Sequence, residues 1–245
     1  MTLIGDRLTT PGANGVASPI RPDTTNGPTP EPSLTIAVVD YDMGNLHSAC
    51  KGLENAGATT IVTDRPRDLE QADAVVLPGV GAFDPAMQHL RSRNLIAPLK
   101  AVIASGKPFL GICLGMQILC DNSEEGQEPG LGVIPGTVRR FRSEPGITIP
   151  HMGWNQLALT QPQSPLWTEL PHPAWVYFVH SYYVDPIDPQ VTAATVTHGS
   201  QQVAAAIARD SLMAVQFHPE KSAQVGLKIL ANFVSYVRAQ QLVAR

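Results

Sequence analysis

One cysteine in this sequence lies in a pattern that could make it a nucleophile. Cys113 is the centre of a Gly-Ile-Cys-Leu-Gly segment. The apolar stretch 107–111 before it predicts a strand, and the stretch 114–119 after it predicts the start of a buried helix. Glycines on both sides suit a nucleophile elbow, a strand-to-helix turn too sharp for side chains beside the reactive residue. The helix N-terminus would favour the thiolate, and the backbone N–H of Leu114 would face a developing oxyanion.

A thiol nucleophile needs a base, and the base needs a group that holds its tautomer. His218 and Glu220 can supply both, because they follow the apolar segment 212–217, which predicts a strand. Structural alternatives remain open, since a cysteine among apolar residues is commonly a core residue and His-Pro-Glu commonly opens a helix. His180 is a second candidate base, but no carboxylate follows it two residues later. Together the residues favour a Cys-His-Glu triad.

The segments that must position these residues alternate between strand and helix patterns. Strands are predicted at 34–40, 59–63 and 74–77, and helices at 46–56, at 84–105 with an interruption at Pro98, and at 222–238. This alternation predicts an α/β fold with a doubly wound, mostly parallel sheet flanked by helices. Ligands of such sheets bind at the carboxyl ends of the strands. Cys113, His218 and the Gly79–Gly81 loop all follow predicted strands, so one shared site is expected there.

The remaining segments predict an antiparallel β insertion and two ends of different character. Short strands are predicted at 132–142 and 147–159, one aromatic strand at 175–183, and a hairpin formed by 191–197 and 203–208. Residues 1–33 are rich in Pro, Gly, Thr and Asn, which predicts a disordered tail before a domain at 34–240. Residues 240–245 are expected to fray.

Composition excludes several classes of protein. The 245 residues carry a net charge of -4 and no basic patch, so nucleic-acid binding is not expected. No apolar run approaches the roughly 18 residues of a membrane span, and residues 1–33 lack the apolar segment of a secretory signal. Three cysteines at irregular spacing favour the reducing cytoplasm, with Cys50 and Cys120 predicted to be core residues. We predict no cofactor, and no metal or nucleotide site.

Five motifs resemble the class I (triad) glutamine amidotransferases. The motifs PGVGAF at 78–83, GICLGMQ at 111–117 and QFHPEKS at 216–222 resemble the three signatures of that family. PHMGWN at 150–155 and YFVHSYY at 177–183 resemble more specifically its glutaminase subunits of imidazole glycerol phosphate synthases. The resemblance runs from about residue 34 to about 238. It implies a flavodoxin-like fold and a heterodimer with a cyclase subunit, a (β/α)8 barrel of histidine biosynthesis.

The resemblance also implies a reaction and a role for each matching residue. Cys113, His218 and Glu220 would hydrolyse glutamine to glutamate and ammonia, and the complex would use the ammonia as a lyase to make imidazole glycerol phosphate and an aminoimidazole carboxamide ribotide. The oxyanion site would comprise Val80, Gly81 and Leu114, after the Val80 peptide reorients. Glutamine would be bound by Gly79, Gln117, Glu125, Ser181 and Tyr182. The cyclase would contact Asn45, Pro150, Met152, Trp154, Tyr177 and Lys221.

Several of these residues have ordinary structural explanations that the sequence leaves open. Gly79–Gly81 could form a simple turn, Glu125 could belong to a charged surface loop, and Met152 with Trp154 could pack in the core. Two other functions also remain. The chain could be the glutaminase of another ammonia-channelling synthase, such as one that makes pyridoxal phosphate or aminodeoxychorismate, or a non-catalytic binding subunit. The complete triad and both oxyanion glycines argue against the latter.

Overall fold

A computed structural model describes residues 34–243 of this chain, and eight of the strands in that range form one sheet. The sheet order is β2 (Thr59–Thr63), β1 (Thr35–Val39), β3 (Ala74–Gly79), β4 (Phe109–Cys113), β13 (Leu212–Val215), β12 (Gln201–Arg209), β11 (Thr192–His198) and β8 (Ala158–Leu159). The first five strands are parallel neighbours, and the last three complete the sheet in antiparallel pairs. The predicted doubly wound, mostly parallel sheet is therefore confirmed.

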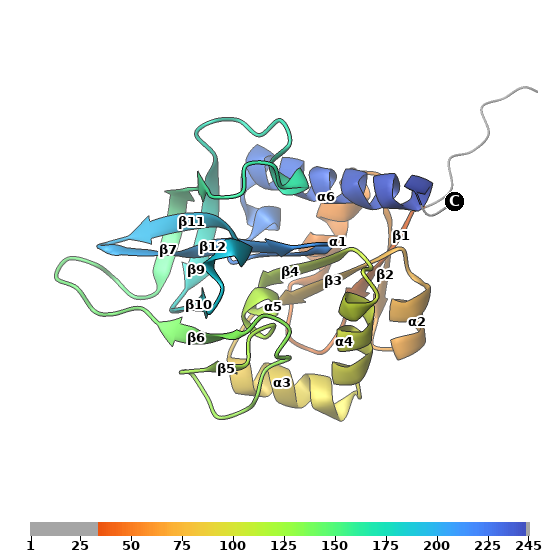
Figure 1. The fold of residues 1–245 in the computed structure, drawn as a ribbon, viewed down its shortest axis with the longest axis horizontal. Helices are drawn as coiled ribbons and strands as arrows, with labels where there is room; N and C mark the ends of the chain where they lie inside the picture. The colour runs from red at the N-terminus through yellow and green to blue at the C-terminus, as the bar shows by residue number, and fades with distance from the viewer. Residues whose placement is uncertain (1–33, 244–245) are drawn as a thin grey trace, which may run out of the picture. The chain divides into compact units, whose positions relative to one another are not determined.

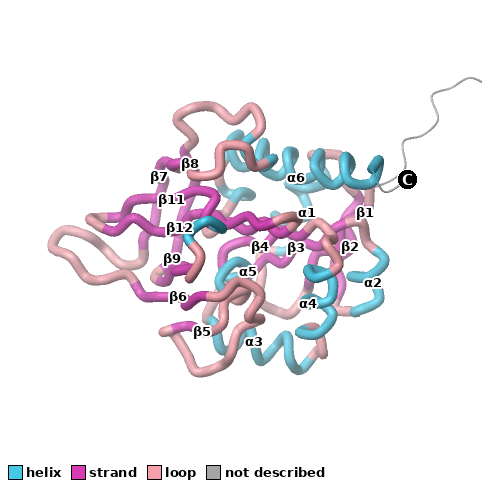
Figure 2. Tube along the Cα trace, in the orientation of Figure 1, coloured by secondary structure: helices cyan, strands magenta, loops and turns pink. Residues whose placement is uncertain are grey.

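Helices cover both faces of this sheet (Figures 1 and 2). One face carries α1 (Leu46–Asn55) and the long α6 (Ala223–Val243), and the other carries α2 (Pro66–Gln71), α3 (Phe83–Ser92), α4 (Ile96–Ala104) and the short α5 (Leu114–Gln117). Each face has its own cluster of buried apolar side chains. The central strands β3, β4 and β13 are thus buried on both sides, as parallel sheets require, whereas the edge strand β2 is largely exposed.

The predicted antiparallel insertion forms two small sheets of its own, in which one strand pair is parallel and the other two are antiparallel. One contains β10 (Tyr182–Pro186), β6 (Gly136–Arg140) and β5 (Asn122–Ser123), and the other is a ribbon of β7 (His151–Gln156) and β9 (Trp175–His180). The single strand predicted at 175–183 is wrong, because the chain leaves the ribbon at Ser181 and pairs with β6 instead. Short 3₁₀ turns η1 (Pro165–Trp167), η2 (Pro189–Val191) and η3 (Pro219–Lys221) complete the described elements.

Two helix boundaries also differ from the prediction. The helical segment at 84–105 breaks between α3 and α4 around Asn94, which has φ 55°, and not at Pro98. Pro98 is the third residue of α4, where the N–H it lacks would have no acceptor within the helix. Residues 240–243 continue α6 instead of fraying. The predicted disordered tail at 1–33 lies outside the described residues.

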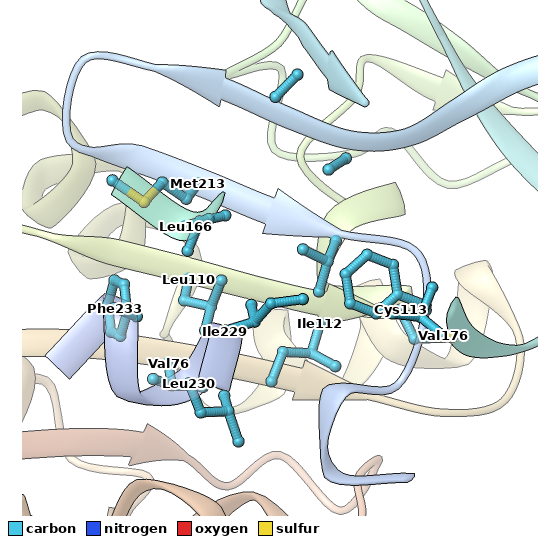
Figure 3. Packing of buried hydrophobic residues seen from close by; sticks show 14 of the residues in the cluster. Val76, Leu110, Ile112, Cys113, Leu166, Val176, Met213, Ile229, Leu230 and Phe233 are labelled. Atoms are coloured by element: carbon cyan, nitrogen blue, oxygen red, sulfur yellow. The ribbon is translucent and has the colours of Figure 1, made fainter. Parts of the chain in front are cut away.

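Packing of α6 against the sheet fixes the strand that carries Cys113 (Figure 3). Ile229, Leu230 and Phe233 of α6 are fully buried in the same apolar cluster as Leu110 and Ile112 of β4. Burying side chains of this size stabilises the fold by about 1.5–3 kcal/mol each. The end of β4 is therefore a rigid support. The two other cysteines, Cys50 and Cys120, are buried and free as predicted.

Candidate active site

Cys113 ends β4 in a backbone conformation that few residues adopt. Its φ of 55° and ψ of -108° lie outside the regions favoured by side chains, and α5 begins at the next residue. A Cβ on Gly115 would lie 1.8 Å from the Leu77 carbonyl oxygen, and one on Gly111 would lie 2.7 Å from the Gly115 carbonyl oxygen. Both glycines are needed for this close approach, so the predicted elbow is confirmed. Strain of this kind concentrates at functional sites.

His218 and Glu220 form a buried pair in the segment that follows β13, with Gln216 and Phe217 between the strand and His218. The His218 Nδ1 atom lies 2.8 Å from the Glu220 Oε1 atom, and the two side chains are only 2% and 4% exposed. Pro219 and Glu220 also open η3, so the helix-opening interpretation of His-Pro-Glu holds together with the pairing. Nδ1 therefore carries a proton toward the carboxylate. The buried Nε2 atom has no hydrogen-bond partner among residues 34–243 and remains available to the thiol.

The surroundings of His218 favour its charged form. Burial by itself lowers the pKa of the imidazole, but the nearby Cys113 and Glu220 side chains outweigh it and raise the pKa to about 9. At neutral pH the ring is then an imidazolium beside a sulfur and a carboxylate. This is the arrangement that a thiolate nucleophile requires.

His180 borders the same cavity but cannot act as the base. Its Nδ1 atom lies 2.8 Å from the Tyr182 carbonyl oxygen and its Nε2 atom lies 3.1 Å from Nδ1 of His151, so both ring nitrogens are occupied. Burial lowers the pKa of His180 to about 3, despite the opposing effect of the Tyr182 hydrogen bond. The ring stays neutral, with its proton on Nδ1. The geometry thus supports the prediction from the sequence that His218, and not His180, is the base.

A cavity of about 340 Å³ lies over Cys113. Except for Gly79 and Glu220, every residue predicted for catalysis, the oxyanion site or glutamine binding lines it. The lining residues are Val80, Gly81, Cys113, Leu114, Gln117, Glu125, Pro150, Val179, His180, Ser181, Tyr182 and His218. Gly79 and Glu220 instead line a small hollow that they share with Asn45 and that also touches Val80 and His218. The volume suits a small polar molecule.

Two polar side chains of the cavity wall are held in defined positions. Gln117, one helical turn after Cys113, donates from Nε2 to the Tyr182 carbonyl oxygen at 3.0 Å and to Gln216 Oε1 at 3.1 Å. Glu125 accepts a hydrogen bond from the Phe83 backbone N–H at 2.9 Å, at the start of α3. Glu125 is therefore no free surface charge, because its carboxylate borders the cavity and is anchored there.

The two predicted oxyanion donors differ in their present bonding. Leu114 is the first residue of α5, so its N–H has no acceptor within the helix. The Val80 N–H instead donates to the Met43 carbonyl oxygen at 3.1 Å. An oxyanion role for Val80 would therefore require its peptide to turn, as the family resemblance implies. Gly81, next along the chain, has a φ of +105°, which gives this loop an unusual backbone path.

Of the predicted interface residues, Met152, Trp154 and Lys221 are exposed, and the others are half-buried. Met152 and Trp154 point from one face of β7 and are 62% and 50% exposed, so the core-packing alternative is wrong. Trp154 pairs with Tyr177 across the ribbon, with their rings 6.1 Å apart. The Tyr177 carbonyl oxygen accepts the His218 backbone N–H at 3.0 Å. Lys221, also exposed, follows Glu220. We call Met152, Trp154, Tyr177 and Lys221 the ribbon patch.

Sequence reasoning missed one residue that contacts Cys113. Gln216 is fully buried, and its Nε2 atom lies 3.7 Å from the Cys113 sulfur. The available signal was a polar residue inside the apolar strand segment 212–217. Among residues 34–243, no three His, Cys, Asp or Glu side chains are placed so that they could hold a metal ion, and no helix is long and apolar enough to cross a membrane.

Comparison with known proteins assigns the family. Residues 37–236 match the model for glutamine amidotransferase class-I. The imidazole glycerol phosphate synthase subunit HisH of Gloeothece citriformis is 75% identical over 207 residues, which cover 84% of this chain and 98% of that protein. The HisH subunit of Acaryochloris marina is 74% identical over 204 residues, with 83% and 95% coverage. PurLQS from Thermotoga maritima shares the fold, with a TM-score of 0.64, 20% identity, and coverage of 83% of this chain and 99% of that one.

The match includes the motifs, the parallel sheet and the elbow that carries Cys113, and it confirms the resemblance predicted from the sequence. The chain therefore belongs to the class-I glutamine amidotransferase family, among the HisH subunits of imidazole glycerol phosphate synthase.

Proposed function

We propose that this chain is the glutaminase subunit of an imidazole glycerol phosphate synthase, with Cys113, His218 and Glu220 as its catalytic triad. The observation that carries the proposal is the placement of Cys113. It sits on a strained elbow at the floor of the cavity, next to an imidazole whose far nitrogen is bonded to a buried carboxylate. The free cysteines support a reducing compartment, the cytoplasm.

The first chemical step is attack on glutamine bound in the cavity. The Cys113 thiolate forms a bond to the side-chain amide carbon, and the carbonyl oxygen becomes an oxyanion. The Leu114 N–H, joined by the Val80 N–H once its peptide has turned, stabilises this oxyanion. Gln117, Glu125 and the segment at Ser181 and Tyr182 line the cavity and would hold the amino-acid end of glutamine.

His218 then moves the protons that the reaction needs. Its Nε2–H protonates the amide nitrogen as the C–N bond breaks, which releases ammonia and leaves a glutamyl thioester on Cys113. A water molecule, deprotonated by His218, hydrolyses this thioester to glutamate, and the Cys113 thiolate leaves beside the imidazolium that has formed. Glu220 holds the ring in the required tautomer and stabilises the imidazolium in both steps.

Ammonia released into water at neutral pH would be protonated and would lose its nucleophilicity, so a partner must receive it directly. The ribbon patch supports a docked cyclase, because exposed large apolar side chains mark partner surfaces. Pro150 at the cavity rim and Asn45 behind the triad extend the predicted contact. The hydrogen bond between Tyr177 and the His218 backbone gives this surface a direct connection to the triad. The partner would be a (β/α)8 barrel that makes imidazole glycerol phosphate.

The test is glutamate formation from glutamine, measured for the chain alone, with a candidate cyclase, and with the cyclase loaded with its ribonucleotide substrate. Cys113→Ala provides the blank. We expect weak hydrolysis alone and a sharp rise in the loaded complex, both lost in the variant. Hydrolysis that depends on Cys113 but is not increased by the cyclase would overturn the assignment to this synthase. Hydrolysis that persists in Cys113→Ala would overturn the triad.

A further inference from the structure

Gln216 occupies a position where neighbouring residues are apolar. It follows β13, and its side chain is fully buried, as are those of Val215 and Phe217 beside it. Its backbone N–H donates to the Ala205 carbonyl oxygen at 2.8 Å, so the main chain is satisfied by the sheet. Burying an amide side chain is unfavourable unless its polar atoms are paired. The partners of that amide therefore indicate why it is there.

Hydrogen bonding fixes which end of the Gln216 amide faces the sulfur. The Tyr182 carbonyl oxygen can only accept, so the atom of Gln117 that faces it must be the Nε2 donor. The same Nε2 atom lies 3.1 Å from Gln216, which must therefore present its oxygen there. This leaves Gln216 Nε2, a donor, directed at the Cys113 sulfur at 3.7 Å.

We infer that Gln216 donates a hydrogen bond to the Cys113 sulfur and stabilises its thiolate form. The inference deepens the proposed function and rests on it. A hydrogen bond to the ionised form of a group favours ionisation. Because Gln216 also accepts from Gln117, the donor to the sulfur is held by a residue of the cavity wall.

The test is the rate at which iodoacetamide alkylates Cys113 in the full-length protein, measured against pH by peptide mass spectrometry. Gln216→Met removes the donor with little change in volume. Gln201→Met is the matched control. Gln201 is another buried glutamine, and it bonds Arg142 and Glu144 instead of the site. If Gln216→Met does not fold, Gln216→Asn serves, because its shorter side chain cannot span from Gln117 to Cys113.

A hydrogen-bond donor that stabilises the thiolate changes the rate of alkylation at low pH but not at high pH. We expect alkylation in Gln216→Met to be about tenfold slower at low pH, equivalent to one pH unit, and to converge with the unmodified protein at high pH, where the thiol is ionised in both. The Gln201→Met profile should match the unmodified protein. The inference would be overturned if the alkylation rate of Gln216→Met equalled that of the unmodified protein at every pH, or if it were lower by the same factor at every pH. An inert Cys113 in the unmodified protein would overturn the proposed function, and this inference with it.

Discussion

His218 illustrates how a residue gains its chemistry from its neighbours. Its ring lies between the Cys113 sulfur and a buried carboxylate, and these two groups raise the pKa to about 9 against the opposing effect of burial. His180, only 38 residues earlier along the chain, has both nitrogens bonded and a pKa lowered to about 3. The same side chain is thus a charged acid in one place and a neutral support in another.

Replacing Glu220 with Gln tests the role of the carboxylate. The amide cannot stabilise the imidazolium, so we expect glutamine hydrolysis by the cyclase complex to fall by about 100-fold or more. The pKa of His218 should also drop, which moves the pH profile of the remaining activity to lower pH. The control is Glu169→Gln, at an exposed carboxylate that pairs with Lys228. Equal rates in Glu220→Gln and the control would refute the role.

Sequence could indicate the three proposed catalytic residues but not all of their contacts. Cys113, His218 and Glu220 lie in short motifs whose spacing has a chemical meaning by itself. Gln216 and Cys113 are 103 residues apart, and their contact depends on β4 and β13 being sheet neighbours. The bond from the Val80 N–H to Met43 likewise depends on how two loops meet. Such contacts follow from tertiary placement, which no local pattern encodes.

At the scale of elements, the elbow and the ribbon differ in how well the sequence predicts them. The elbow is local, because its two glycines are within two residues of Cys113. The break at Ser181 is not local, since β9 and β10 pair with different partners while the sequence alternates without interruption. The helix break at Asn94 was also misplaced, because Pro98 is harmless in the first turn of α4.

Gly115→Ala tests the close packing of the elbow. The new Cβ would lie 1.8 Å from the Leu77 carbonyl oxygen, so β3 and α5 would have to separate. We expect the free energy of unfolding to fall by about 3 kcal/mol or more in urea denaturation. Gly106→Ala is the comparison, because nothing lies within 4 Å of its Cβ position and only its φ of +78° is unfavourable. A smaller loss in Gly115→Ala than in Gly106→Ala would contradict the packing argument.

Trp154→Ala tests the ribbon patch as a docking surface. Trp154 is half exposed, so its removal should change the free energy of unfolding by less than about 1 kcal/mol. If it contacts the cyclase, the dissociation constant of the complex should rise by about tenfold or more in calorimetric titration. Ile187→Ala, at another exposed apolar residue, should leave binding unchanged. Unaltered affinity in Trp154→Ala would remove this residue from the interface.

At the scale of the whole molecule, the sheet brings the site together at the carboxyl ends of its central strands β4 and β13. The predicted alternation of strands and helices matches the parallel part of the sheet. The predicted hairpin of 191–197 and 203–208 matches β11 and β12. The order of the strands could not be predicted from alternation, yet that order places β13 beside β4 and hence His218 beside Cys113. The family resemblance implied that His218 works together with Cys113, which the alternation of strands and helices does not establish by itself.

Buried histidines should shape the stability of the whole fold on both sides of neutral pH. His180 and His151 have pKa values lowered by burial to about 3 and about 4, so the unfolded chain binds more protons below about pH 6.5 and stability falls as pH drops. His218 has a raised pKa of about 9, so its contribution is complete below about pH 6.5 and is lost as pH rises through 9.

Urea denaturation across this range should therefore show a maximum near pH 6.5. Each unit of pKa difference corresponds to about 1.4 kcal/mol. We expect His151→Gln to flatten the acidic side above pH 4.5, where most carboxylates are still ionised, and His218→Gln to flatten the alkaline side. Variants with the same pH dependence as the unmodified protein would contradict these assignments.

The most direct measurement is covalent labelling with a diazoketone analogue of glutamine, which alkylates the nucleophile that attacks it. The complex with the cyclase would be labelled, digested and mapped by mass spectrometry while glutaminase activity is followed. The account predicts one label per chain on Cys113, in proportion to the activity lost, with protection by glutamine. Activity lost through a label on another residue, or a fully labelled Cys113 with activity intact, would contradict it.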